Sequence, residues 1–210
     1  MDRAGFPFVA LASLPAAFAA LLGAIAVALI LLVLPIAIGL FFRDPRRTPP
    51  TADANAVLSP ADGTVMFAGD AKPEEAPSGA WRQVTIFLSP LDVHINRAPV
   101  GGLVTRVDYH RGSFLPAYKS GAHANERSEI WLDSGGRVVV ARQVVGVMAR
   151  RVVCRLVAGD RVAVGDRIGL MKFGSRMDVF MPPSTTLSVS TGQRVRGGET
   201  VIARMEPAKG

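Results

Sequence analysis

Cysteine and metal-binding motifs are nearly absent from this sequence, which narrows the kinds of site that it can hold. The single cysteine, Cys154, excludes an internal disulfide. It lies in an apolar run over residues 152–157, which favours a core or half-buried strand position. The three histidines occur without any His-x-His, His-Glu-x-x-His or Cys-x-x-Cys pattern, so we expect no bound metal.

Charge is missing from a long N-terminal segment. No charged residue occurs between Gly5 and Phe42, where Leu, Ala, Ile, Val and Phe dominate. As one continuous helix this segment would be about 55 Å long, against roughly 30 Å for the hydrocarbon core of a bilayer. We therefore predict a membrane anchor over residues 1–42. It is either one helix from about Ala16 to Phe42 with an interfacial lead-in, or a hairpin broken near Pro15 or Gly23.

The charges that flank the anchor argue against a cleaved signal peptide and predict an orientation. A signal peptide has a basic n-region and an apolar core of about 7–15 residues, whereas only Arg3 precedes this much longer run. Basic residues follow the run instead, as Arg43, Arg46 and Arg47. By the positive-inside rule, a single span would leave its C-terminal side in the cytoplasm. The sequence thus predicts a protein of the cell (inner) membrane with the domain that follows the anchor on the cytoplasmic side.

The remainder of the chain is basic. Because Asp2 and Arg3 cancel, the whole formal charge of +7 lies after Phe42. A basic domain held at a bilayer suits anionic lipid headgroups, where each nearby Lys or Arg contributes on the order of 1 kcal/mol. Nucleic acid is the usual alternative partner, but no aromatic-and-basic RNA motif, zinc-finger spacing or recognition-helix pattern is present. We expect an anionic membrane surface as a partner and no nucleic acid.

Amphipathic helical spacing is absent after the anchor, and β patterns take its place. Residues 43–55 are rich in Pro, charge and small side chains and predict a linker. Beyond it, β-branched or alternating runs recur between Gly, Pro, Asp and Asn at intervals of about 8–12 residues. We therefore predict a β-rich domain over residues 56–210. The runs that predict strands cover residues 57–68, 81–88, 103–109, 129–132, 137–147, 151–157, 167–173, 177–181, 187–190 and 199–204.

Repeated turn patterns indicate the kind of β fold. Residues 161–168 and 193–201 each place a Val-x-x-Gly turn between two strand-like runs. Together with Ser-Pro-Ala-Asp-Gly-Thr-Val at residues 59–65, this pattern is typical of barrel-sandwich (lipoyl-like) domains. Residues 72–79 predict a polar surface loop, and residues 116–125 a Gly/Ala-rich loop long enough to be a lid or active-site loop.

His94 lies in the most suggestive polar tract. In an extended strand Asp92, His94 and Asn96 would share one face, since side chains alternate. Such a row could line a cleft with His94 as general base, because histidine titrates near neutrality. The alternative is a solvent-facing polar strand surface. For His110 and His123 we expect structural roles.

Two further positions could carry chemistry. Asp62 sits in an Asp-Gly turn, and it either serves that turn or orients His94 as the acid of a Ser-His-Asp arrangement. The Gly174-Ser175 dipeptide separates two strand-like runs. Glycine leaves its carbonyl open to approach and tolerates strained backbone, so the hydroxyl of Ser175 could attack the bond before it.

Taken in order, these segments resemble the phosphatidylserine decarboxylase family, in particular its short, membrane-anchored prokaryotic form. The resemblance covers nearly the whole chain. It is carried by the apolar N-terminus ending in Phe-Phe-Arg-Asp-Pro, and by Ser-Pro-Ala-Asp-Gly, Ser-Pro-Leu-Asp-Val-His-Ile-Asn-Arg-Ala-Pro, Ala-Asn-Glu-Arg and Lys-Phe-Gly-Ser-Arg.

The resemblance implies a self-processed zymogen. The Oγ of Ser175 would attack the Gly174 carbonyl, and autocatalytic cleavage would give a β chain of residues 1–174 and an α chain of residues 175–210. Ser175 would become a pyruvoyl group, which forms a Schiff base with phosphatidylserine and draws electrons as pyridoxal phosphate does elsewhere. Phosphatidylethanolamine would be the product, with neither a metal nor pyridoxal phosphate bound. Asp62 and His94 match the residues that would activate Ser175.

Two departures from the longer enzymes of the family stand out. Arg97 occupies the position of a second histidine that is the better triad member there, and Gly-Ser-Arg replaces Gly-Ser-Thr. Arg97, Lys119 and Arg127 are weak candidates for binding the substrate phosphate. Two alternatives remain open: the same chemistry on another amino-phospholipid, or a lipoyl-like adaptor without catalysis, for which Lys172 is the nearest attachment residue. An α/β heterodimer is expected, and a higher oligomer is left open.

Overall fold

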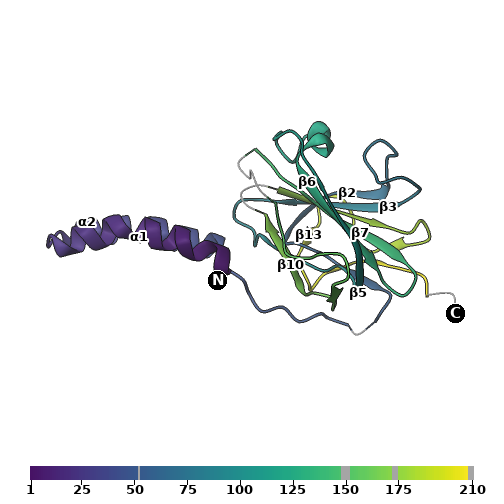
Figure 1. The fold of residues 1–210 in the computed structure, drawn as a ribbon, viewed down its shortest axis with the longest axis horizontal. Helices are drawn as coiled ribbons and strands as arrows, with labels where there is room; N and C mark the ends of the chain where they lie inside the picture. The colour runs from purple at the N-terminus through teal and green to yellow at the C-terminus, as the bar shows by residue number, and fades with distance from the viewer. Residues whose placement is uncertain (52, 148–151, 172–174, 208–210) are drawn as a thin grey trace. The chain divides into compact units, whose positions relative to one another are not determined.

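The computed structural model describes residues 1–51, 53–147, 152–171 and 175–207. The chain divides into two compact units, Met1–Arg46 and Arg47–Gly210. The first is helical and the second is built of β-strands, so the expected class of a mainly β fold with an N-terminal apolar helix is confirmed (Figure 1).

The N-terminal unit is a helical hairpin. A 3₁₀ turn at Arg3–Gly5 leads into α1 (Phe6–Leu21), and α2 (Ile25–Leu31) and α3 (Val33–Phe41) return along it. Of the two predicted forms the structure has the hairpin, broken at Gly23, whose φ of 75° suits glycine. Pro15 stays inside α1 without breaking it. The N–H of Asp2 donates to the carbonyl of Phe42 at 2.8 Å, which ties the two ends of the hairpin together.

The surface of this hairpin is apolar on all sides. Large side chains of both arms are more than half exposed, among them Leu11, Phe18, Ile30 and Ile36. A helix that is hydrophobic all round needs a protein core or a lipid phase around it. One helical segment, Arg3–Leu21, is long and apolar enough by length and composition to cross a membrane. The hairpin therefore indicates membrane association.

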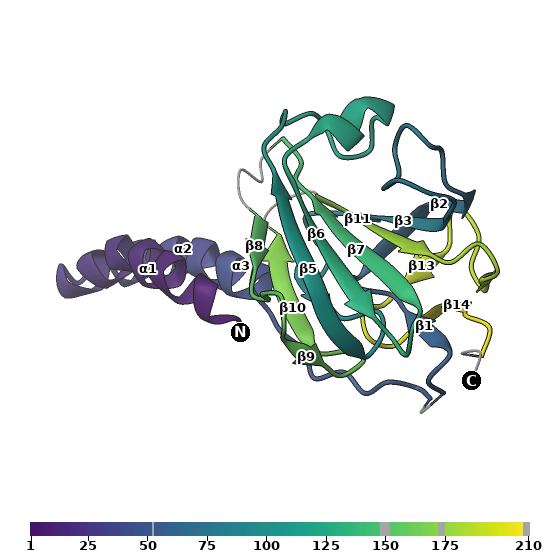
Figure 2. The same cartoon turned by 45° about the vertical axis from the view of Figure 1, so that its right-hand side comes forward.

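Three antiparallel sheets form the second unit (Figures 1 and 2). Residues that are β-branched or alternate in polarity form most of the strands, as expected from their propensity. The largest sheet curls through the order β13 (Arg194–Val195), β2 (Gly63–Asp70), β3 (Arg82–Leu88), β11 (Ser175–Met181), β7 (Val138–Val144), β6 (Arg127–Asp133), β5 (Gly102–His110) and β9 (Arg161–Val162). The two smaller sheets have the orders β4 (Ile95–Arg97), β10 (Arg167–Met171), β8 (Val152–Cys154), and β1 (Ala56–Leu58), β14 (Val201–Arg204), β12 (Thr186–Leu187).

Several predicted strands have different limits in the structure. The run over residues 57–68 is two strands, β1 and β2, because the Ser-Pro-Ala-Asp-Gly segment turns the chain between them. The polar tract around His94 is a strand only over Ile95–Arg97, since Asp92 lies in a tight turn. The predicted loop over residues 116–125 contains a 3₁₀ helix, Ser120–Ala124. Cys154 is half-buried in β8, as predicted.

Strand β11 runs through the middle of the large sheet and is buried on both faces. Side chains alternate along a strand, and Met177, Val179 and Met181 point into the main hydrophobic core. Arg176, Asp178 and Phe180 therefore point to the opposite face. By the same alternation Ser175 shares the core face with Met177.

Candidate active site

Ser175 is the first residue of β11 and is fully buried. It pairs with Leu88, the last residue of β3. Its Oγ has no hydrogen-bond partner among the residues that the structure describes. A buried polar group without a partner costs free energy and is uncommon in native proteins. Ser175 is therefore a candidate for a reactive residue. Gly174, the other half of the predicted scissile bond, lies outside the described residues, as does Lys172.

Two backbone links limit how far His94 can lie from Ser175. The N–H of Met171 donates to the carbonyl of His94 at 3.3 Å, and Ser175 pairs with Leu88. Four extended residues span at most about 14 Å. With the 3.3 Å hydrogen bond added, the backbone of His94 lies within about 17 Å of the backbone of Ser175. His94 is fully buried, which makes the solvent-facing alternative wrong.

The hydrogen bond made by the His94 ring selects its tautomer. Nδ1 lies 2.9 Å from the backbone carbonyl oxygen of Asp92. A carbonyl oxygen can only accept, so Nδ1 carries a proton and donates. In the neutral ring Nε2 is then the basic nitrogen, which is the state that a general base requires.

Asp92 fixes the turn that supplies this carbonyl. Its carboxylate accepts from the N–H of Ser89 at 2.8 Å and from the guanidinium of Arg194 at 2.6 Å. The side chain of Asp92 is thus used in the turn and does not stand in a row with His94 and Asn96 along a strand. The turn pattern of Ser-Pro-Leu-Asp could have indicated this role, since Asp and Ser commonly close such turns.

Asp62 is placed among different partners from those expected for a triad. Its carboxylate accepts from the guanidinium of Arg47 at 2.9 Å and from the N–H of Gly197 at 2.8 Å. Arg47 also donates to Glu199 at 2.7 Å. Within the part of the chain that the structure describes, no hydrogen bond joins Asp62 to His94. Through these contacts Asp62 holds its own turn, over residues 59–63, against residues 197–199 and against Arg47.

The outer face of β11 carries a buried ion pair directly beside Ser175. Arg176 donates to both carboxylate oxygens of Asp178 at 2.9 Å, and Asp178 is fully buried. Thr85 donates a further hydrogen bond to Asp178 at 2.9 Å, and Gln83 donates to Thr85. Burial lowers the pKa of Arg176, but the charge and hydrogen bonds of Asp178 outweigh it, so the pKa is raised. The ion pair with Asp178 is a structural role for Arg176 that the sequence pattern did not predict.

Arg142 extends the charged cluster to the neighbouring strands. Burial lowers its pKa, and the charges of Asp178 and Glu129 offset this only in part. Its Nε donates to Glu129 at 2.9 Å, and its guanidinium lies 4.5 Å from the centre of the Phe180 ring. The pKa of an ordinary arginine lies far above neutrality, so Arg142 and Arg176 both stay charged at physiological pH.

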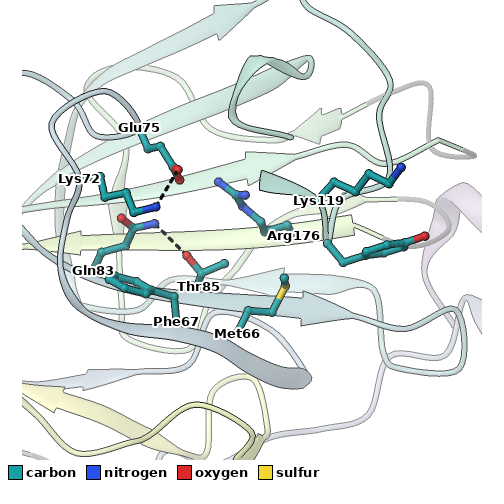
Figure 3. A pocket seen from close by; sticks show the side chains of 9 residues that line it. Met66, Phe67, Lys72, Glu75, Gln83, Thr85, Lys119 and Arg176 are labelled. Carbon is teal, nitrogen blue, oxygen red and sulfur yellow. Dashed lines mark hydrogen bonds and ion pairs between the residues drawn. The ribbon is translucent and has the colours of Figure 1, made fainter. Parts of the chain in front are cut away.

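A pocket of about 170 Å³ opens on this outer face of the sheet (Figure 3). Arg176 and Thr85 lie in its interior, with Lys72 and Lys119 at opposite ends (Figure 3). Lys72 forms an ion pair with Glu75 at 3.8 Å. The lining residues are Met66, Phe67, Lys72, Glu75, Gln83, Thr85, Tyr118, Lys119 and Arg176.

The three weak candidates for phosphate binding lie in three different places. Lys119 is exposed at the pocket just described. Arg97 is buried and donates to the carbonyl of Gly165 at 3.0 Å. Arg127 lines a separate open pocket, where it donates to Glu129 at 3.2 Å. The structure does not bring them together into one site.

One group of side chains has a composition that could suit a metal ion. The ligand atoms of Asp108, His110 and Glu129 lie within 4.8 Å of one another. The two carboxylates are engaged by arginines, Asp108 by Arg106 at 2.7 Å and Glu129 by Arg142 at 2.9 Å. Those cations neutralise the charge that would attract a metal. His123, the remaining histidine, lies in the 3₁₀ helix of the 116–125 loop.

Comparison with known proteins identifies the family. A profile of the phosphatidylserine decarboxylase family matches residues 35–203. Proteins named phosphatidylserine decarboxylase proenzyme are similar to this chain: one from Pelodictyon phaeoclathratiforme is 44% identical over 165 residues, covering 78% of this chain and 77% of the relative. One from Gluconobacter oxydans is 45% identical over 171 residues, with 79% and 75% covered. One from Anaplasma phagocytophilum is 39% identical over 216 residues, with 98% and 91% covered. The chain belongs to the phosphatidylserine decarboxylase family.

Proposed function

We propose that this protein is an enzyme that decarboxylates phosphatidylserine to phosphatidylethanolamine after cleaving itself between Gly174 and Ser175. The observation that carries the proposal is the buried hydroxyl of Ser175, which has no partner among the described residues. The tautomer of His94 leaves Nε2 as a basic nitrogen, which supports its proposed role as the base. The word proenzyme in the names of the relatives supports a processed form.

Self-cleavage begins with His94. Its Nε2 takes the hydroxyl proton of Ser175, and Oγ attacks the carbonyl carbon of Gly174. The peptide C–N bond breaks and an ester forms, with a free amine on Ser175. Loss of the Cα proton then breaks the Cβ–O bond and releases the Gly174 carboxylate. The dehydroalanine that remains takes up water and loses ammonia, which leaves a pyruvoyl group at residue 175.

Asp62 completes the proposed processing machinery in a supporting role. Its carboxylate holds the turn over residues 59–63 against residues 197–199 through Gly197, and it pairs with Arg47. We propose that it acts on His94 through the packing of these segments, since Arg97 of β4 packs on the same Gly197–Gly198 turn.

The fit of a pyruvoyl group rests on the setting of residue 175. Such a group is small and made from the serine itself, and its place in a fully buried position protects a reactive carbonyl from water. The pyruvoyl carbonyl supplies an electron sink for the decarboxylation once it is joined to the amine of the substrate. We propose no metal and no pyridoxal phosphate.

The two products of cleavage stay associated in this proposal. Strand β11, which would begin the α chain, lies between β3 and β7 of the β chain. Strands β13 and β14 of the α chain pair with β2 and β1. Separating the chains would break all of these ladders and expose the main core. We therefore propose an α/β heterodimer, and whether heterodimers assemble into a higher oligomer is left open.

Apolar side chains exposed on loops near Ser175 support a lipid substrate. Leu91, which is 83% exposed, follows the strand that pairs with Ser175. Tyr118, which is 60% exposed, packs edge-on against Phe87, the partner of Arg176. With the apolar hairpin and the net positive charge, these loops suit an anionic membrane surface, which we propose to be the cytoplasmic face of the cell membrane.

Mass spectrometry of the purified full-length protein tests the proposal. The wild type should give two fragments divided at Gly174/Ser175, the smaller blocked at its N-terminus, and should release CO₂ from phosphatidylserine in vesicles. Ser175→Ala should stay intact and inactive, whereas Ser190→Ala, which removes an exposed hydroxyl, should behave as wild type. An intact wild-type chain without decarboxylation would refute the proposal, and assays on other amino-phospholipids define the substrate.

His94→Ala tests the proposed base separately. Loss of the base should slow self-cleavage by about 10²–10⁴-fold, the usual contribution of general acid–base catalysis. Cleavage is followed over time after synthesis of the chain. Processing of His94→Ala at the wild-type rate would remove His94 from the mechanism while leaving the role of Ser175 intact.

A further inference from the structure

A buried amide pair bridges two sheets near Ser175. Gln143 of β7 donates from Nε2 to Oδ1 of Asn96 in β4 at 2.7 Å, and both side chains are fully buried. Strand β7 belongs to the large sheet and β4 to a three-stranded sheet. The sequence placed Asn96 on the same face as His94, and gave no indication of Gln143.

Each amide keeps unused hydrogen-bonding capacity. Oε1 of Gln143 and Nδ2 of Asn96 have no partner among the described residues. Exchanging the nitrogen and oxygen positions of both amides would give the same result. The pair would still make one hydrogen bond and keep one free donor and one free acceptor. Ser128, which pairs with Gln143 across β6 and β7, is also buried and its Oγ lacks a described partner.

The strand registers place Gln143 next to Ser175 and Ser128 one strand further away. Ser128, Gln143 and Met177 form one row across β6, β7 and β11. Residues paired across antiparallel strands share a face, and Met177 points into the core together with Ser175. Ser175 is therefore the diagonal neighbour of Gln143, at a Cα separation of about 7–8 Å, within reach of long side chains.

The hydrogen bond between Gln143 and Asn96 lies in a closely packed part of the interior, against Gly169. At Gly169 of β10, which pairs with Asn96, a Cβ would lie 2.7 Å from Nε2 of Gln143 and 2.3 Å from the carbonyl oxygen of Val153. Glycine inside a strand often marks such a close approach. The amide of Gln143 can therefore occupy this position only because residue 169 has no side chain.

We propose that Asn96, Gln143 and Ser128 form a recognition site for the zwitterionic serine headgroup, which deepens the proposed function and rests on it. A serine headgroup carries a carboxylate, which only accepts hydrogen bonds, and an amine, which donates them when protonated. The free N–H of the amide pair and the Ser128 hydroxyl suit the carboxylate, and the free amide oxygen suits the amine. Gln143 is the diagonal neighbour of residue 175, where the amine must react, and Asn96 and Ser128 both adjoin Gln143.

This site also distinguishes substrate from product. The ethanolamine headgroup has lost the carboxylate, so the donors that bound it would again lack a partner. Sites built to hydrogen-bond a substrate group discriminate strongly against an analogue without that group. The site thus favours binding of phosphatidylserine and release of phosphatidylethanolamine.

Ser128→Ala in the full-length protein is the sharpest test, because it removes only a hydroxyl without a described partner. We expect normal self-cleavage and an increase of about tenfold or more in KM for phosphatidylserine in vesicles, as loss of a hydrogen bond to a charged group predicts. Gln143→Met, which keeps the volume and removes both polar atoms, should raise KM further. Thr185→Val is the matched control: its hydroxyl is also buried without a described partner, but it lies beyond the other end of β11.

The outcomes separate this inference from the proposed function. A wild-type protein without decarboxylase activity refutes the proposed function itself. An active wild type, together with cleaved Ser128→Ala and Gln143→Met variants whose KM is unchanged, overturns only the headgroup site. Failure of Ser128→Ala to cleave would overturn it as well, because the headgroup is absent from the processing reaction. Should Gln143→Met fail to fold, Ser128→Ala still decides.

Discussion

Gly169 shows how a single residue can set the geometry of a site. Its backbone lies against the carbonyl of Val153, and the amide of Gln143 fills the space that a side chain would take. The φ angle of Gly169 is not in the left-handed region, so close packing is the reason for glycine here. The spacing between β10 and the large sheet therefore depends on this residue.

Gly169→Ala should destabilise the protein by about 1–3 kcal/mol, the usual cost of forcing an extra methyl group into a packed interior. Chemical denaturation followed by circular dichroism measures this loss. Gly69→Ala is the control, because a Cβ there meets only the ring of Phe67, which can move. Equal stability of the two variants would show that the strands separate at little cost and that the close contact does not define the site.

At the scale of the element, β11 joins Ser175, the proposed nucleophile, to a buried ion pair. Ser175 faces the core, and the next side chain, Arg176, forms a double hydrogen bond with Asp178 on the other face. Asp178 receives a third hydrogen bond from Thr85 of the neighbouring strand. These hydrogen bonds hold the side chains of Arg176 and Asp178 at the start of β11. They therefore also hold the backbone that carries Ser175.

Asp178→Leu should destabilise the protein by about 3–5 kcal/mol, because it leaves the guanidinium of Arg176 buried without its charge partner. The double variant Arg176→Met, Asp178→Leu should recover much of this loss, since two apolar side chains can replace a buried pair. Free energies of unfolding for the two single variants and the double variant form the cycle that measures the coupling. Strictly additive losses would contradict a direct interaction.

Local pattern predicted much of the fold and part of the site. The β-runs, the half-buried position of Cys154 and the polar tract around His94 follow from residue spacing, because alternation and turn residues act over a few positions. The hydrogen bonds between His94 and Met171 and between Asn96 and Gln143 join residues far apart in the sequence, and no local pattern specifies them. The expected pairing of Asp62 with His94 is not among the described hydrogen bonds, since Arg47 and Gly197 occupy the carboxylate of Asp62.

At the scale of the whole molecule, the hairpin bears on how the chain enters the membrane. Its two ends are joined by the Asp2–Phe42 hydrogen bond and by stacking of Phe8 on Phe42, with ring centres 5.7 Å apart. Basic residues flank both ends, whereas the turn at Gly23 carries no charge. The positive-inside rule therefore favours both ends on the cytoplasmic side. A single span would have to separate ends that the structure holds together.

Labelling of single cysteines in membrane vesicles tests this topology. In a Cys154→Ser background, Arg3→Cys and Thr48→Cys report the two ends of the hairpin, and Thr191→Cys, an exposed position, reports the β domain. A maleimide that cannot cross the bilayer should modify all three from the cytoplasmic side only. At 1.5 Å per residue the 19 residues of the helical segment Arg3–Leu21 extend about 28 Å, close to a hydrocarbon core of roughly 30 Å. Because this length carries Gly23 away from the cytoplasmic side, Ala24→Cys should resist the reagent from that side. Reaction of Arg3→Cys and Thr48→Cys from opposite sides would refute the hairpin.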